Sequence, residues 1–195
     1  MEFTVCSRDD SYVSTPPEAF GDPADVVYAW VSRYLCGRRH GGTTERVVCP
    51  ASAKSLDSEQ IWVSVFRDRP GDDAMDRSVT TAEAFFLAKV DFSDPRDIYK
   101  SVIVAYPALD DPEGHAELER AHKRLKPSFV RKGLMLGQFY SSCQEASVID
   151  TRLKPLQSPI PMLAIRRMVK EDRAFLTRTP ELLPHYFDRF PDEAH

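Results

Sequence analysis

Residues 101–140 carry the pattern that decides the fold: SVIVAYPALDDPEGHAELERAHKRLKPSFVRKGLMLGQFY. The apolar, β-branched run over 101–106 predicts a strand, which Pro107 ends. Residues 111–132 have their apolar side chains at helical spacing, and we expect Pro127 to kink or divide this helix. Residues 134–140 predict a second strand. A strand, a helix and another strand in succession indicate helices layered on a sheet.

Two more strands are predicted on either side of this unit. They are residues 61–66 (IWVSVF) and residues 162–168 (MLAIRRM). Further helices are expected over residues 22–37, 171–177 and 180–189. Residues 82–90 fit a helix or a strand, of which the helix is favoured, and RDRPGDDAMD (67–76) is expected to be an exposed loop. The sequence therefore predicts an α+β protein with about four strands in a mixed sheet and helices packed on it.

The length of 195 residues corresponds to one domain of ordinary size. Residues 1–20 are polar, contain Pro16-Pro17 and show no periodicity, so we expect a flexible N-terminal arm. Residues 21–195 are then the single α+β domain.

Composition excludes several classes of protein. The net charge is −4 at pH 7 and the pI is about 5.8, which argues against general nucleic-acid binding. No apolar run is long enough to span a membrane, and the first residues, MEFTVCSRDD, lack the features of a signal peptide. The four cysteines have no zinc-ligand spacing. We expect a cytoplasmic protein with reduced thiols and no disulfide.

Common catalytic and cofactor motifs are absent from the sequence. It contains no GxGxxG, GxxxxGK[ST], GxSxG or HExxH pattern, so a standard nucleotide loop is not expected. His115 and His122 lie seven positions apart on one predicted helix. Two helical turns separate them by ~10.5 Å, too far for both to bind one metal unless Glu117 and Glu119 also contribute. We therefore expect solvated helix residues and no metal site.

Arg166 and Arg167 are unusual because they lie in an apolar strand. Alternation places them on opposite faces, so at least one arginine points toward an apolar layer and needs a carboxylate partner. That partner is either an internal acid, on an edge strand, or the carboxylate of a bound substrate. We expect one arginine to contact a protein carboxylate and the other to face a pocket.

Two further segments are candidates for a site. The connection over residues 140–161 has three prolines and no periodicity, and such long loops are often functional, so we expect it to line the main pocket. Cys49-Pro50 precedes the first strong strand. Such a pair indicates either a thiolate that contacts haem iron or a buried cysteine before a turn.

The C-terminal half resembles a family of domains of unknown function. GLMLGQFY (133–140) is similar to its GLMIGxFHP-like strand, and LKPLQSPIPMLAIRRMV (153–169) is similar to its RPLxSPxPxLAIRHM-like segment. Cys49-Pro50 matches its Cys-Pro-Phe, with Ala51 in place of the aromatic residue. The resemblance covers most of residues 45–177, and the family brings no established activity with it.

A more distant resemblance is to the YqcI/YcgG-type proteins, which include haem-dependent hydroxylases. In this sequence Tyr140-Ser141 stands where their His-Pro falls, and Arg167 replaces a histidine. The resemblance implies haem as the cofactor, with Cys49, His122 and Tyr140 as its contacts.

We expect a small biosynthetic enzyme that acts on a small carboxylate-bearing substrate, with haem-dependent oxidative chemistry as the implied reaction. Tyr140, Arg166 and Arg167 are the expected catalytic residues, and one of the arginines holds the substrate. The alternative is a non-catalytic protein that binds a small molecule or assists such a pathway. In that case it could form a homodimer through its apolar strands.

Overall fold

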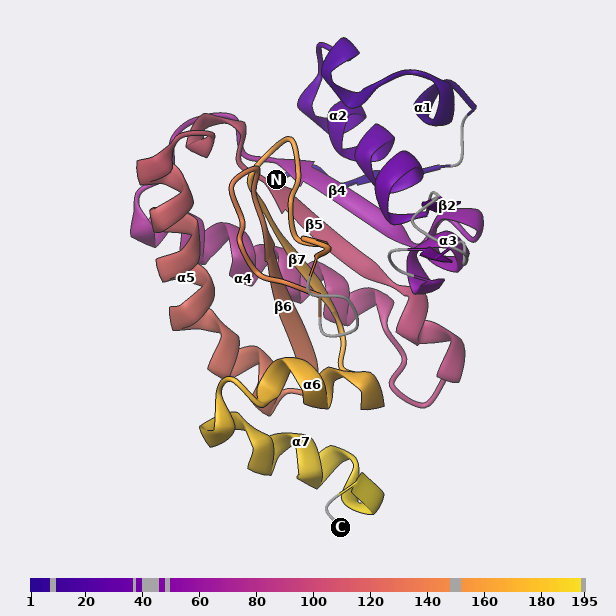
Figure 1. Cartoon of the computed structure of the whole chain (residues 1–195). Helices are drawn as coiled ribbons and strands as arrows, with labels where there is room; N and C mark the ends of the chain where they lie inside the picture. The colour runs from indigo at the N-terminus through magenta and orange to yellow at the C-terminus, as the bar shows by residue number, and fades with distance from the viewer. Residues whose placement is uncertain (8–9, 37, 40–45, 48–49, 148–151, 194–195) are drawn as a thin grey trace.

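Five strands form the main sheet of the computed structural model, in the order β1-β4-β5-β7-β6 (Figure 1). Their bounds are β1 Thr4–Val5, β4 Ile61–Val65, β5 Ser101–Ala105, β6 Leu134–Phe139 and β7 Met162–Arg167. The structure describes residues 1–7, 10–36, 38–39, 46–47, 50–147 and 152–193. All four strands predicted from the sequence are present, and the predicted α+β class with a mixed sheet is confirmed.

The sheet is mixed because one of its strand pairs is parallel. β4 and β5 run parallel and are joined through helix α4 (Asp72–Lys89) and the 3-10 turn η3 (Pro95–Tyr99), the usual way to connect parallel neighbours. The pairs β1–β4, β5–β7 and β6–β7 are antiparallel. β7 lies between β5 and β6, so the suggestion that Arg166 and Arg167 lie on an edge strand is wrong.

The remaining helices surround this sheet (Figure 1). They are α1 Asp10–Ser14, α2 Pro23–Trp30, α3 Pro50–Asp57, α5 Pro112–Arg131, α6 Arg173–Leu176 and α7 Leu183–Arg189, and the π-helical segment Val31–Leu35 continues α2. A separate two-stranded sheet pairs β2 (Arg38–Arg39) with β3 (Arg46–Val47).

Asp22 caps α2 and Asp111 caps α5, and each carboxylate accepts a hydrogen bond from a backbone N–H of its helix. α5 continues through Pro127, so the expected division of this helix does not occur.

Both faces of the sheet are apolar and covered. Val104 packs with Phe86 in a buried cluster that includes α4 and α5. Its neighbour Ile103 points to the opposite face and packs with Val27 of α2. A third cluster, formed by α6, α7 and the start of β6, closes the end of the sheet at which β7 stops.

The N-terminal segment, which the sequence suggests is a flexible arm, makes contacts with the rest of the chain in the structure. Thr4 lies opposite Val63 of β4, and the Cys6 N–H donates to the Ile61 carbonyl at 2.7 Å. The ring of Tyr12 in α1 packs edge-on against Tyr28 of α2. This segment therefore adds an edge strand and a short helix to the domain.

Two helices begin where the sequence suggests loops. α4 begins at Asp72, inside the expected loop 67–76, after Gly71 at its N-cap. Asp72 and Asp73 in its first turn interact favourably with the helix dipole, although they make the segment look like a loop. α3 (Pro50–Asp57) occupies the polar stretch before β4, which has too few apolar residues to show helical periodicity.

Two expectations about the chain as a whole can be compared with the described residues. Within them, no helix combines the length and apolar character needed to cross a membrane. Among the described residues, Cys6, Cys36 and Cys143 form no disulfide with one another, and Cys49 lies outside the described residues.

Candidate functional site

Tyr140 lies at the end of β6, where the chain enters the long connection to β7. Its side chain is 5% exposed, and its hydroxyl donates a hydrogen bond to the Glu119 carboxylate on α5. Burial and the neighbouring Glu119 raise the pKa of Tyr140, so the phenol stays protonated and remains a donor. The tyrosine therefore fixes the Glu119 carboxylate at the junction of α5 and β6.

The ring of His115, one turn before Glu119 on α5, packs against the Tyr140 ring with their centroids 4.8 Å apart. His115 is 8% exposed, and each of its ring nitrogens has a partner. Nδ1 lies 2.9 Å from Ser142 Oγ, and Nε2 lies 3.3 Å from Asp110 Oδ1. The structure thus places a serine, a histidine and an aspartate in one hydrogen-bonded chain.

The direction of these hydrogen bonds follows from the chemistry of the groups. An ionised carboxylate only accepts, so the bond to Asp110 requires the proton of the neutral imidazole to be on Nε2. Nδ1 then carries a lone pair and accepts the hydroxyl proton of Ser142. Ser142 and Asp110 are both exposed, whereas the imidazole between them is buried. The serine oxygen is therefore open to solvent at one end of the chain.

A hollow of about 280 Å³ opens beside these groups, and we call it the Tyr140 hollow. It is lined by Pro112, His115, Ala116 and Glu119 of α5, by Tyr140, and by Ser142 and Gln144 of the following segment. Three features that the sequence singles out meet here: the histidine-bearing helix, Tyr140 and the start of the 140–161 connection. The far part of that connection is held by α2, since Trp30 Nε1 donates to the Gln157 carbonyl at 3.0 Å.

His122 lies two turns further along α5 and is not among the described residues that line this hollow. Its Nε2 is 2.8 Å from the Leu136 carbonyl, which can only accept, so Nε2 carries the proton. Burial lowers the pKa of His122 to about 4. The expectation of a solvated helix residue is therefore wrong, because this imidazole is only partly exposed and is hydrogen-bonded to the edge strand β6.

Arg166 is engaged by a protein carboxylate. Its Nη1 and Nη2 donate to the two oxygens of Asp172 at 2.7 and 2.5 Å, and the Asp172 side chain is 1% exposed. The same carboxylate accepts the N–H of Val169 at 2.8 Å. This is the internal ion pair that the sequence analysis leaves open as one alternative.

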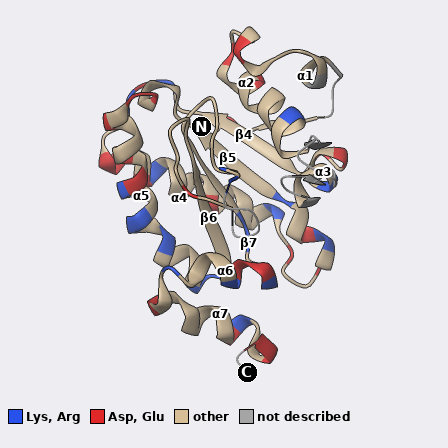
Figure 2. Cartoon of the chain, in the orientation of Figure 1, with Lys and Arg blue, Asp and Glu red and all other residues tan. Residues whose placement is uncertain are grey.

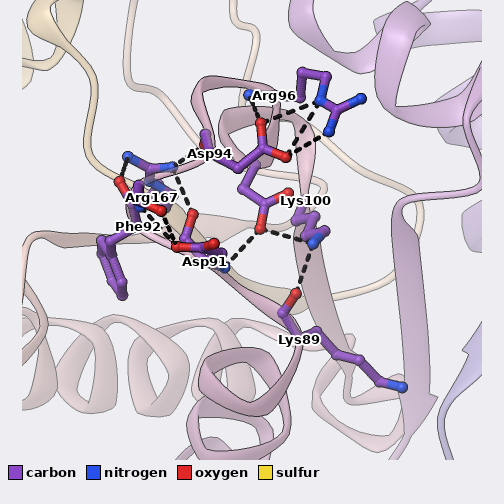
Figure 3. A network of polar contacts seen from close by, with 9 residues as sticks. Lys89, Asp91, Phe92, Asp94, Arg96, Lys100 and Arg167 are labelled. Carbon is purple, nitrogen blue, oxygen red and sulfur yellow. Dashed lines mark hydrogen bonds and ion pairs between the residues drawn. The ribbon is translucent and has the colours of Figure 1, made fainter.

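Arg167 binds backbone carbonyls. Its guanidinium donates to the carbonyls of Asp91, Phe92 and Asp94 at 3.3, 3.1 and 2.8 Å (Figure 3). It also lies over the Phe92 ring at 5.1 Å from the centroid. The guanidinium therefore fastens β7 to the turn before η3.

The expected catalytic residues do not form one site. In the β6–β7 register, Met162 pairs with Phe139, next to Tyr140, whereas Arg166 pairs with Met135. At a rise of ~3.3 Å per residue, the arginine end of β7 is about 15 Å from Tyr140. Neither arginine is among the described residues that line the Tyr140 hollow.

A larger hollow, of about 620 Å³, lies between α3 and η3. Several of its charges pair with one another: Asp94 binds Arg96 at 2.8 Å and Asp97 binds Lys100 at 2.7 Å (Figure 3). No described residue of the 140–161 connection lines it. The expectation that this connection borders the main pocket thus holds only for the smaller hollow.

Haem, which the distant resemblance implies, does not fit the described candidate ligands. The Tyr140 hydroxyl is committed to Glu119, and its raised pKa disfavours the phenolate that binds iron. The proton-bearing Nε2 of His122 is committed to Leu136. Cys49 lies outside the described residues. We therefore derive no chemistry through haem.

The sequence analysis missed three residues of this site, Asp110, Ser142 and Gln144, and it considered Glu119 only as a neighbour of a metal site. Nothing in their local pattern distinguishes them, because Asp110 precedes α5 and Ser142 follows β6 without any motif. Only indirect features of the sequence pointed to this site. They are a histidine on a predicted helix and a tyrosine at the start of a long irregular connection.

A scan against protein-family models matches residues 24–195 to Domain of unknown function (DUF6875). The chain belongs to this family. The match confirms the predicted membership of a family of unknown function, and it extends beyond the expected 45–177 at both ends. Searches of the curated proteins and of the solved structures found no match. For this DUF6875 protein, the function must therefore be argued from the geometry of the Tyr140 hollow.

Proposed function

We propose that the protein is a small-molecule enzyme that catalyses acyl transfer to water at the Tyr140 hollow. The observation that supports this proposal is the hydrogen-bonded chain Ser142–His115–Asp110, whose exposed serine lines the hollow. Each residue has a role that its chemistry supplies: Ser142 is the nucleophile, His115 the general base and Asp110 the group that orients the imidazole.

The reaction proceeds in two balanced steps. Ser142 Oγ forms a bond to the carbonyl carbon of a small ester while its proton passes to His115 Nδ1. The bond to the leaving alcohol breaks, and the alcohol takes that proton from His115. Water then attacks the acyl-serine by the same route, which releases the carboxylic acid and restores the hydroxyl.

Gln144 is the candidate group for stabilising the negative oxygen that develops during attack. Its side-chain Nε2 donates to the Ser142 carbonyl at 3.0 Å and has a second hydrogen, and the residue lines the hollow. Removing one such donor costs about 10²–10³-fold in kcat in enzymes of this type. We expect Gln144→Ala to lower kcat by about 10²-fold.

This proposal keeps one expectation from the sequence, that of a small enzyme with a small-molecule substrate. The role in biosynthesis and a homodimer stay predictions. The carboxylate clamp is not retained, since Asp172 engages Arg166 and three carbonyls engage Arg167. Haem has no part in the proposed reaction.

The test is hydrolysis of p-nitrophenyl acetate combined with labelling by a fluorophosphonate. We expect turnover by the wild-type protein and one labelled peptide, which contains Ser142. Ser142→Ala should remove the label and lower kcat/KM by about 10³-fold or more, and His115→Gln should act similarly.

Ser141→Ala is the matched control, because this neighbouring exposed serine bonds to Asp110 at 3.3 Å, whereas Ser142 is the serine that bonds to the imidazole. We expect its kcat/KM to stay within about twofold of wild type. Melting temperatures of all variants establish that they fold. A wild-type protein that neither hydrolyses esters nor takes the label would overturn the proposal and leave the non-catalytic binding protein as the better interpretation.

A further inference from the structure

We propose that Glu119 binds a cationic group of the substrate, so that the enzyme prefers short esters or amides that carry an ammonium group. This inference rests on the proposed function, because it assigns the substrate class of the same hollow. It requires a carboxylate that is fixed in place, open to a ligand and not neutralised by a lysine or arginine beside it.

The position of Glu119 is fixed from one side. One carboxylate oxygen accepts a hydrogen bond from the hydroxyl of Tyr140, whose buried ring packs against His115. A carboxylate has acceptor sites for several hydrogen bonds, so this contact leaves the group able to accept from a ligand. Glu119 is exposed and lines the hollow that Ser142 also lines. Its charge is therefore available close to the proposed nucleophile.

The charge of the hollow favours a cation. No lysine or arginine is among the described residues that line it, whereas Glu119 lines it and Asp110 lies behind His115. Acidic residues are concentrated in the first half of α5, which contains Glu113, Glu117 and Glu119, and basic residues in the second half (Figure 2). Arg69 lies beside this acidic half and forms ion pairs with Asp111, Glu113 and Glu117. A substrate carboxylate in this hollow would meet a like charge, and no lysine or arginine among the described lining residues would offset it.

The size of the hollow limits the substrate. About 280 Å³ is at the lower end of the volumes of small-molecule sites. An acyl group of a few carbons with a terminal ammonium satisfies both the volume and the charge. We therefore assign short ω-amino acyl esters as the preferred class.

Three p-nitrophenyl esters of similar length test this assignment: that of β-alanine, which is cationic, that of butyric acid, which is neutral, and the monoester of succinic acid, which is anionic. We expect kcat/KM to be about threefold to tenfold higher for the cationic ester than for the neutral one, and lowest for the anionic ester. Glu119→Gln should remove this preference by raising KM for the cationic ester, so that within this variant the cationic and neutral esters have equal kcat/KM.

Glu113→Gln is the matched control, since Glu113 is 81% exposed and is not among the described residues that line the hollow. It should retain the preference. Equal kcat/KM for the three esters, or a preference that survives Glu119→Gln, overturns the substrate class while leaving the proposed function standing.

A binding measurement separates the two proposals if no ester is hydrolysed. Chemical shifts of the wild-type protein titrated with propylammonium and with propionate report binding without turnover. We expect propylammonium to bind and propionate not to bind, and Glu119→Gln to abolish the difference. Equal binding of both ions by the wild-type protein contradicts the role of Glu119 whatever the outcome with esters.

Discussion

At Gly114, near the start of α5, the structure leaves no room for a Cβ atom. A Cβ at this position would lie 2.4 Å from the Leu109 carbonyl oxygen and 2.6 Å from Leu109 Cα. These are backbone atoms of the turn that precedes α5, so they cannot move aside as a side chain can. The glycine lets Asp110 and the helix that carries His115 come close together.

We expect Gly114→Ala to destabilise the protein by about 3 kcal/mol, since relief of the contact requires a backbone shift. Urea unfolding monitored by circular dichroism gives the free energy. Gly21→Ala is the matched control: its new Cβ meets nothing within 4 Å, so stability should change by less than about 0.5 kcal/mol. Equal stabilities of the two variants would show that the Leu109 backbone can move away from the new Cβ at little cost.

His122 makes stability depend on pH. Its pKa is lowered to about 4 by burial, from 6.5 in the unfolded chain. Between these values the unfolded chain binds a proton that the folded chain does not, so stability falls as the pH drops from about 6.5 to about 4. The shift corresponds to a loss on the order of 3 kcal/mol.

His122→Gln should reduce this slope, because glutamine can donate to the Leu136 carbonyl without titrating. Urea midpoints at a series of pH values measure the slope. His185→Gln, at a side chain that is 37% exposed, is the control and should leave the slope near that of wild type. An unchanged slope in His122→Gln would mean that another group is responsible.

At the scale of elements, β7 shows how two neighbouring arginines can both be structural. Arg166 holds the short 3-10 turn after the strand through Asp172, and Arg167 holds the turn before η3. The sequence correctly indicates that an arginine in an apolar strand needs a partner. It does not indicate that Asp172, six residues later, supplies that partner to Arg166, because the turn between them has no recognisable motif.

Arg166→Leu leaves the Asp172 carboxylate buried without its cation, so we expect a loss of about 3–5 kcal/mol in unfolding free energy. The double variant Arg166→Leu/Asp172→Leu should recover part of this loss, since both charges are then gone. Chemical denaturation of the two variants gives the comparison. A single variant as stable as wild type would mean that the pair contributes nothing to the fold.

Periodicity explains which elements were predictable. β5 and β6 are apolar runs of strand length, and the apolar spacing of α5 is regular enough to survive Pro127. β1 has only two residues, too few to show an alternating pattern, and its pairing with β4 is set by a contact far away in sequence. Elements that are stabilised mainly by tertiary contacts could therefore not be predicted from the sequence.

At the scale of the whole molecule, the candidate site was only partly predictable. Tyr140 and the start of its connection could be singled out because they depart from regular patterns. The grouping of Asp110, His115 and Ser142 could not, since it depends on how α5 packs beside the end of β6. Patterns in a sequence report burial and local structure well, but they do not report which distant polar groups meet.

The position of β1 affects the tendency of the protein to aggregate. The family match begins at residue 24, so the strand that covers the outer edge of β4 lies outside the matched region. Without it, β4 would present unpaired backbone groups, the kind of edge through which proteins join into aggregates. A chain lacking residues 1–7 should therefore associate with itself as concentration rises, measured by light scattering against the full chain. If the truncated chain and the full chain scatter light equally at every concentration, β1 does not protect the protein against aggregation.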